Sequence, residues 1–148
     1  MANSKTAISA IETFRGVSYP WHCDSMGHMN TQFYSVLFDG ATLHALAALA
    51  SSADLTRKGL GWADVRQLVE YKHEVAAGTL LVISTTFFRV GTTSVSYLHS
   101  LKGLETGKLH ATSEQKTVLF DLKQRRAAPL SEAIRIRAAE LGLCAGTT

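Results

Sequence analysis

The sequence is short of the features that mark specialised classes of protein. Only two prolines and eleven glycines occur among its 148 residues, which excludes a collagen-like chain or a proline-rich linker. Charged residues make up only 18% and hydrophobic residues 46%, so the chain as a whole is not intrinsically disordered. No run approaches the ~18 apolar residues of a membrane-spanning helix, and residues 1–10 hold no apolar signal segment. We therefore expect one cytoplasmic domain over residues 1–148, with no membrane partner and with loose ends at 1–10 and 144–148.

Cysteine and basic charge are also sparse. The two cysteines, Cys23 and Cys144, form no CxxC pattern and have no matching pair of histidines, so neither a metal site nor a disulfide framework is expected. The net charge is only +3, and the densest basic cluster is Lys123, Arg125 and Arg126. A protein that binds nucleic acid usually carries a longer basic stripe, so we expect no such partner, whereas a small polyanionic ligand stays open.

The spacing of apolar residues predicts the order of the elements. A helical repeat predicts one long buried helix from Thr31 to about Ala50, with Asn30 as its N-cap and with Gly40 allowing close approach of another backbone. The helix residues expected to face the core are Phe33, Leu37, Ala41, Ala45, Ala48 and Leu49. Strands are expected at 11–19, 65–75, 79–90, 93–102 and 109–122, a polar connection at 51–64, and a short helix after Ser131.

This order predicts an α+β fold in which one long helix covers one face of an antiparallel sheet of about five strands. One helix leaves the other face of such a small sheet uncovered. Because an uncovered face is often buried against a second copy, we expect at least a dimer.

The segment before the long helix carries the strongest chemical signal. It places Asp24, Gly27 and His28 directly before the helix N-terminus, where free backbone N–H groups and a partial positive charge favour an oxygen that becomes negative. A carbonyl held between these amides and the acid is polarised at its oxygen and open to attack at its carbon. The segment therefore predicts a reaction site.

The pattern D-x-x-G-H-x-N-x-x-x-Y, present as Asp24, Gly27, His28, Asn30 and Tyr34, resembles the 4-hydroxybenzoyl-CoA thioesterase-like group of hotdog-fold enzymes. The resemblance covers about residues 13–141 and includes the 69–72 strand, the 90–95 hairpin and the ending at 121–129. One position departs from the pattern, because many members carry a second acid where this chain has His22.

The resemblance implies an acyl-CoA thioesterase whose sheet wraps the helix. It implies a homodimer or dimer of dimers with subunits paired edge to edge and the active site at their interface. Asp24 is then the acid that attacks the thioester or activates water. The residues implied in binding the thioester oxygen or the substrate are Gly27, His28, Met29, Asn30, Thr31 and Tyr34. Arg89, Arg126 and Lys102 are candidates to meet the phosphates of CoA, although a solvated surface charge is the favoured reading at each except Arg126. CoA enters only as part of the substrate, and no other cofactor is implied.

Other readings stay open at this point. A dehydratase acting on an acyl thioester is one, although neither Pro20 nor Pro129 flanks a histidine as the loop of such enzymes requires. An acyl-CoA or metabolite-binding module without turnover is another. Asp24 is also read as a turn cap, His28 as a structural histidine, Asn30 as a helix cap and Tyr34 as a packing residue. Asp39 is considered as a second catalytic carboxylate, but it is expected to be a solvated or paired acid. The histidines expected to be structural are His44, His73, His99 and His110.

Overall fold

The structure, a computed structural model, describes residues 10–142, so Cys144 and both expected loose ends lie almost wholly outside the described residues. The strands are β1 (Ile11–Val17), β2 (Leu60–Tyr71), β3 (Leu80–Val90), β4 (Ser94–Gly103), β5 (Leu109–Asp121) and the short β6 (Arg126–Ala127). The helices are a 3-10 turn η1 (Pro20–His22), α1 (Thr31–Leu49), α2 (Ser52–Arg57) and α3 (Glu132–Glu140). These elements confirm the expected α+β fold.

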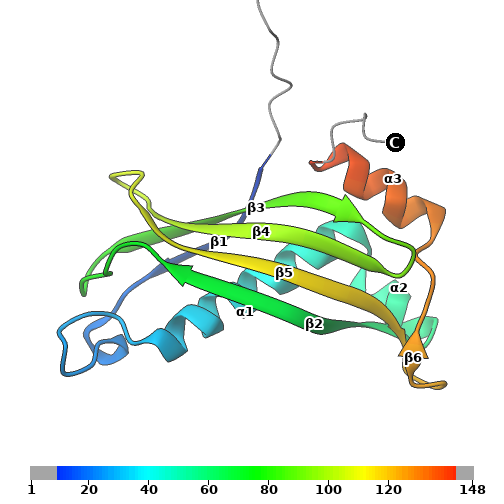
Figure 1. Ribbon diagram of the computed structural model, residues 1–148, viewed down its shortest axis with the longest axis horizontal. Helices are drawn as coiled ribbons and strands as arrows, with labels where there is room; N and C mark the ends of the chain where they lie inside the picture. The colour runs from blue at the N-terminus through cyan, green and yellow to red at the C-terminus, as the bar shows by residue number, and fades with distance from the viewer. Residues whose placement is uncertain (1–9, 143–148) are drawn as a thin grey trace, which may run out of the picture.

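The sheet is antiparallel throughout, with the strand order β1-β3-β4-β5-β2 and β6 paired to β5. Helix α1 lies along one face of this curved sheet (Figure 1). The segment 18–30 joins β1 to α1 at one end of the sheet, which we call the loop end. The opposite end, where α2 and α3 lie, is called the helix end (Figure 1).

Helix α1 begins where the sequence predicts, because the Asn30 side chain accepts a hydrogen bond from the Gln32 N–H at 3.1 Å. Its buried face, however, is displaced by one residue from the expected one at the start of the helix. Phe33 and Leu37 are only half-buried. The residues that are buried against the sheet are Tyr34, Phe38, Ala41, Thr42, Ala45, Leu46 and Leu49. The expectation failed because it assumed that the apolar residues are the buried ones. The helix face that packs against the curved sheet also includes Tyr34 and Thr42.

Gly40 does face a close neighbour, but that neighbour is not a backbone as expected. A Cβ at this position would lie 3.3 Å from ring carbons of Phe14 on β1. The small residue therefore makes room for an aromatic ring, which packs β1 against the helix.

The expected polar connection over residues 51–64 is wrong, because α2 and the first part of β2 occupy it. Ser51 caps α2 by accepting a hydrogen bond from the Asp54 N–H, and Leu55 anchors the helix in the core. Strand β2 starts at Leu60 rather than Val65, and it carries a bulge between Asp64 and Arg66. A bulge changes which side chains share a face, so a simple period of two failed to locate the strand.

The core consists of two hydrophobic clusters. The loop-end cluster contains Met29, Tyr34, Phe38, Ala41, Val75, Leu81, Ile83, Leu101 and Ala111. The helix-end cluster contains Ala45, Leu46, Leu49, Leu55, Phe87, Val95, Tyr97, Leu119, Leu130, Ile134 and Ala138.

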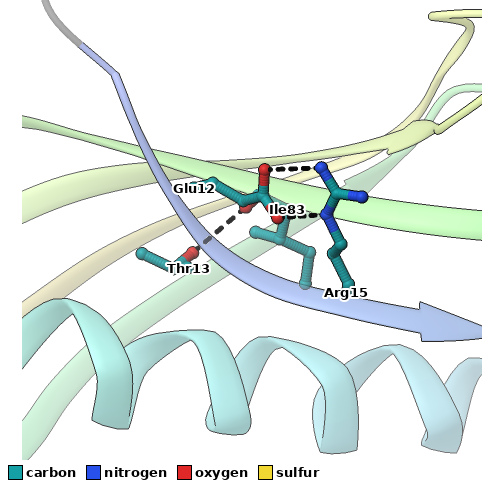
Figure 2. A network of polar contacts seen from close by, with 4 residues as sticks. All are labelled: Glu12, Thr13, Arg15 and Ile83. Atoms are coloured by element: carbon teal, nitrogen blue, oxygen red, sulfur yellow. Dashed lines mark hydrogen bonds and ion pairs between the residues drawn. The ribbon is translucent and has the colours of Figure 1, made fainter.

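A row of buried polar side chains runs between the two clusters. Its centre is His99, which is 0% exposed and hydrogen-bonded to Thr85 at 2.7 Å through Nδ1 and to Thr42 at 2.9 Å through Nε2. Thr42 donates its own proton to Gln115 Oε1, so His99 Nε2 carries a proton and Nδ1 accepts from Thr85. At the β1 end the Thr13 hydroxyl contacts the Thr85 hydroxyl at 2.8 Å. Thr13 also donates a hydrogen bond to the Ile83 carbonyl at 3.3 Å (Figure 2).

Burial lowers the pKa of His99 to about 4, which keeps the ring neutral in this row. The expectation that His99 is structural is therefore consistent with its place in the core.

Within residues 10–142 no helix is long and apolar enough to cross a membrane. The same residues hold no group of three or more histidine, cysteine or acidic side chains suited to a metal ion.

Candidate active site

The segment that follows η1 folds into a tight turn at the loop end. Cys23 and Met29 form an antiparallel bridge, and across it the Asp24 N–H donates to the His28 carbonyl at 3.1 Å. The Gly27 N–H returns to the Asp24 carbonyl at 2.9 Å, and Gly27 adopts a φ of +83° that favours glycine. The turn therefore presents Asp24 and His28 side by side, in front of helix α1.

The Asp24 carboxylate is held by two donors. One oxygen accepts from the Met26 N–H at 2.9 Å, and the other accepts from the Asn30 side-chain amide at 2.7 Å. These hydrogen bonds, the one from Asn30 foremost, lower the pKa of Asp24, and the positive charge that His28 can carry adds to the effect. Asp24 is thus a fixed, exposed carboxylate that is ionised at neutral pH.

Asn30 connects the acid to the helix. Its side-chain oxygen caps α1 through the Gln32 N–H, while its side-chain nitrogen holds Asp24. The sequence left open whether this residue is a cap or a ligand. The structure shows that it is the cap and, in addition, the residue that orients the acid.

The backbone amides at the helix N-terminus are not equally available. The Met29 N–H donates to the Val75 carbonyl and the Asn30 N–H to the His22 carbonyl, both at 2.8 Å. The expected use of these two amides for a substrate oxygen is therefore corrected, since both are already bonded. Among residues 10–142, the N–H groups of His28 and Thr31 have no hydrogen-bond acceptor. These two amides are the ones left for an incoming oxygen.

A pocket of about 540 Å³ opens next to these amides. One wall comes from the start of α1 and the other from the chain that leaves β2. It is lined by His28, Met29, Thr31, Tyr34, Tyr71, Lys72, His73, Glu74 and Lys108. Asp24 and Gly27 are not among these residues, so the acid stands beside the pocket rather than inside it.

Two contacts shape the pocket wall. His28 Nε2 lies 2.6 Å from Glu74 Oε2. The ring of Tyr34, which is only 4% exposed, meets the ring of Tyr71 edge-on at a centroid distance of 5.0 Å, and burial raises the pKa of Tyr34. Tyr34 therefore packs in the core and also lines the pocket, and its contact with a substrate stays a prediction.

Sequence reasoning missed the second wall of this pocket. Tyr71, Lys72 and Glu74 were read as alternating members of a regular strand, and His73 as structural. The strand in fact ends at Tyr71, and the chain then turns so that consecutive residues face the pocket. The run of charged residues at 70–74 is the one signal that would have marked it.

The predicted phosphate ligands lie far from the acid within one chain. Val17, next to the loop, pairs with Leu80 at the start of β3, whereas Arg89 lies near the other end of that strand. Arg126 pairs with Asp121 at the end of β5, also at the helix end. Lys102 lies at the loop end but is not among the residues that line the pocket. A single chain therefore does not bring Arg89 or Arg126 to Asp24.

Comparison with solved structures shows that this fold recurs widely. SAV2348 from Staphylococcus aureus, solved in complex with CoA, superposes with a TM-score of 0.83 over 97% of this chain and 92% of its own, at 14% identity. The probable thioesterase YbaW from Escherichia coli gives 0.77 over 87% and 97% of the two chains at 19% identity. The DHNA-CoA thioesterase from Staphylococcus aureus gives 0.74 over 86% and 91% at 18% identity.

A search of curated proteins found no significant relative. A family model described as the thioesterase-like superfamily matches residues 19–137, which include the loop, α1 and the whole of the sheet except β1. The expected arrangement of a long helix wrapped by an antiparallel sheet is confirmed by the fold and its structural neighbours. The chain belongs to the thioesterase-like superfamily and has the hotdog fold.

Proposed function

We propose that the protein hydrolyses an acyl-CoA thioester to the free acid and CoA. The observation that carries this proposal is the position of an ionised, hydrogen-bonded carboxylate, Asp24, in front of the unbonded amides at the start of α1 and beside a pocket. Membership of the thioesterase-like superfamily supports the same reaction class. A structural neighbour of the same fold was solved in complex with CoA, which supports CoA as the leaving group.

The reaction uses the groups as follows. The carbonyl oxygen of the thioester accepts hydrogen bonds from the N–H groups of Thr31 and His28, which stabilise the negative charge that develops on it. Asp24 then either attacks the carbonyl carbon or takes a proton from a water molecule that attacks it. In both routes the carbon–sulfur bond breaks, its electron pair goes to sulfur, and water supplies the oxygen of the product acid.

We further propose that the site lies at an interface with a second copy of the chain, and the free edge of the sheet supports this. Strand β2 is an edge of the sheet, and its outer hydrogen-bonding groups meet no other strand among residues 10–142. Twelve residues at ~3.3 Å each give an edge of about 40 Å. Antiparallel pairing of two such edges about a two-fold axis places the helix end of one copy beside the loop end of the other. Arg126 then approaches the site of the second copy, whereas Arg89, three strands away, stays remote.

A thiol-release assay over a panel of acyl-CoA esters tests the proposed function. The wild type is expected to release CoA, and Asp24→Asn is expected to lower kcat by at least about a thousandfold, since it removes the attacking or proton-accepting group. Asp39→Asn is the matched control, because Asp39 is an exposed acid on α1. Thiol release by Asp24→Asn at the wild-type rate refutes the mechanism. Tight binding of CoA esters without any release by the wild type identifies a binding module instead.

Mixing of two variants tests the shared site. The Asp24→Asn variant and the Arg126→Ala variant are each expected to have low thioesterase activity when assayed alone. A mixture allowed to exchange subunits regains activity, because one of the two sites then holds an intact acid and an intact arginine. No gain on mixing contradicts the contribution of Arg126 from the second copy.

A further inference from the structure

His28 differs from four of the five other histidines in how its ring is bonded. In His22, His73, His99 and His110 the Nδ1 atom contacts a protein group: a backbone N–H, a carbonyl or, for His99, a threonine hydroxyl. In His28 the bonded nitrogen is Nε2, which meets the Glu74 carboxylate at 2.6 Å. Its Nδ1 has no hydrogen-bond partner among residues 10–142. The ring thus has one nitrogen fixed by an acid and the other free, beside the pocket.

The surroundings of the ring are those of a site rather than of a core. The His28 side chain is 32% exposed, and its own backbone amide is one of the two without an acceptor. It lies near enough to Asp24 for its charge to affect the pKa of that acid. The charged and titratable groups facing it across the pocket are Glu74, Lys72, His73, Lys108, Tyr34 and Tyr71.

Resting on the proposed thioester hydrolysis, we propose that His28 is the proton donor to the departing sulfur and that Glu74 is its positioning residue. When the carbon–sulfur bond breaks, its electron pair goes to sulfur, and sulfur takes a proton from Nδ1 of the doubly protonated ring. The products of this step are the CoA thiol and a neutral His28 that still donates from Nε2 to Glu74. The proton is restored from solvent, so no other reactant is needed.

Glu74 supplies what such a donor requires. A carboxylate at one ring nitrogen fixes the ring orientation and offsets the positive charge that the ring carries before transfer. Glu74 follows the end of β2, whereas His28 precedes α1, so the contact also holds the pocket walls together. Glu74 is 72% exposed and makes no other ion pair among residues 10–142, which argues against a role in core stability.

The test compares two thioesters of one acyl group, chosen from those that the wild type hydrolyses. One is the N-acetylcysteamine ester, whose leaving alkyl thiolate is a strong base and is therefore helped by a proton donor. The other is the 4-nitrothiophenol ester, whose weakly basic thiolate leaves without a proton. Neither contains the nucleotide, so binding of CoA does not enter. We expect His28→Gln to lower kcat for the alkyl thioester about a hundredfold, a size usual for general-acid catalysis, and for the aryl thioester no more than about threefold.

A mutant cycle tests the part played by Glu74. Glu74→Gln is expected to lower kcat for the alkyl thioester about tenfold in the wild-type background and to have no further effect when His28 is already glutamine. Glu12→Gln is the matched control, because Glu12 forms an exposed ion pair with Arg15 on β1, away from the pocket (Figure 2).

The outcomes separate this inference from the proposed function. Absence of hydrolysis by the wild type overturns both the proposed thioester hydrolysis and the role of His28. Hydrolysis by the wild type with equal losses for the two thioesters in His28→Gln overturns the proton-donor role alone. A loss for Glu74→Gln that persists in the His28→Gln background overturns the positioning role. Because each variant is compared with itself on two substrates, partial unfolding does not mimic the expected result.

Discussion

The two ends of the molecule share one sheet and one long helix but differ in what covers the core and in which groups are exposed. At the helix end, α2 and α3 close over an apolar cluster that includes Phe87, Leu119 and Ile134. At the loop end no helix among residues 10–142 other than α1 and the short η1 closes the core, and charged residues such as Glu74 and Lys108 line a pocket beside α1. The buried polar row through His99 lies between them. The difference teaches that the sheet and α1 supply a core at both ends, whereas charged groups beside a pocket lie at the loop end.

The largest expected effect tests whether the helix end serves stability alone. Phe87→Ala removes a ring that is 0% exposed and packs on Tyr97, and it is expected to lower the free energy of unfolding by about 4 kcal/mol. Urea denaturation measures the loss. Thiol release per folded molecule is expected to stay at the wild-type value. A changed KM in Phe87→Ala would contradict the view that the helix end affects stability but not activity.

Acid is expected to act through the polar row. Burial holds the pKa of His99 at about 4, against about 6.5 when unfolded, so between these values the unfolded chain binds a proton that the folded chain does not. Stability is therefore full above pH 6.5 and falls as the pH drops towards 4, by about 3 kcal/mol at ~1.4 kcal/mol per unit. Urea denaturation across this range measures it. The fall is expected to disappear in His99→Gln; a fall that persists places its origin elsewhere.

Thr42 tests how the row ties α1 to the sheet. Thr42→Val keeps the shape of the side chain but leaves His99 Nε2–H and Gln115 Oε1 without this partner, which is expected to cost about 2 kcal/mol of stability. Thr42→Ser, which restores the hydroxyl, is expected to recover most of it in the same denaturation experiment. A loss of kcat at unchanged stability assigns the row to the chemistry of the loop end.

The smallest expected effect compares two helix caps, one at each end. Ser131→Ala removes the cap of α3 and is expected to lower stability by about 1 kcal/mol, with thiol release unchanged. Asn30→Ser keeps a capping oxygen on α1 but removes the amide that holds Asp24. It is expected to keep stability within about 0.5 kcal/mol while lowering kcat about tenfold. Equal behaviour of the two variants contradicts the contrast between the ends.

Local signals allowed much of the loop end to be predicted. The Asn30 cap, the extent of α1 and the loop that presents Asp24 all depend on residues close in sequence, and the structure confirms their positions. The second pocket wall was missed because Glu74 reaches His28 only through the pairing of β2 with the rest of the sheet. Such a contact joins residues 46 positions apart, and nothing in their local pattern records it.

The polar row shows the same limit for the core. His99 looked like one of several scattered histidines, and Thr42 like an ordinary helix residue. Their contact depends on the register of β4 and on the rotation of α1, both of which are set by packing. The one-residue displacement of the buried face of α1 has the same origin. The roles of all the predicted site residues in catalysis and binding stay predictions.

The two free edges of the sheet are unlike, and this limits how copies can join. Strand β1 spans only seven residues, has an irregular register between Glu12 and Phe14, and carries the Glu12–Arg15 ion pair, all of which discourage addition of another strand. Among residues 10–142 only β2 offers a long edge, and the proposed two-fold pairing would occupy it in both copies. With the proposed pairing, addition of further strands is therefore expected to stop at the dimer.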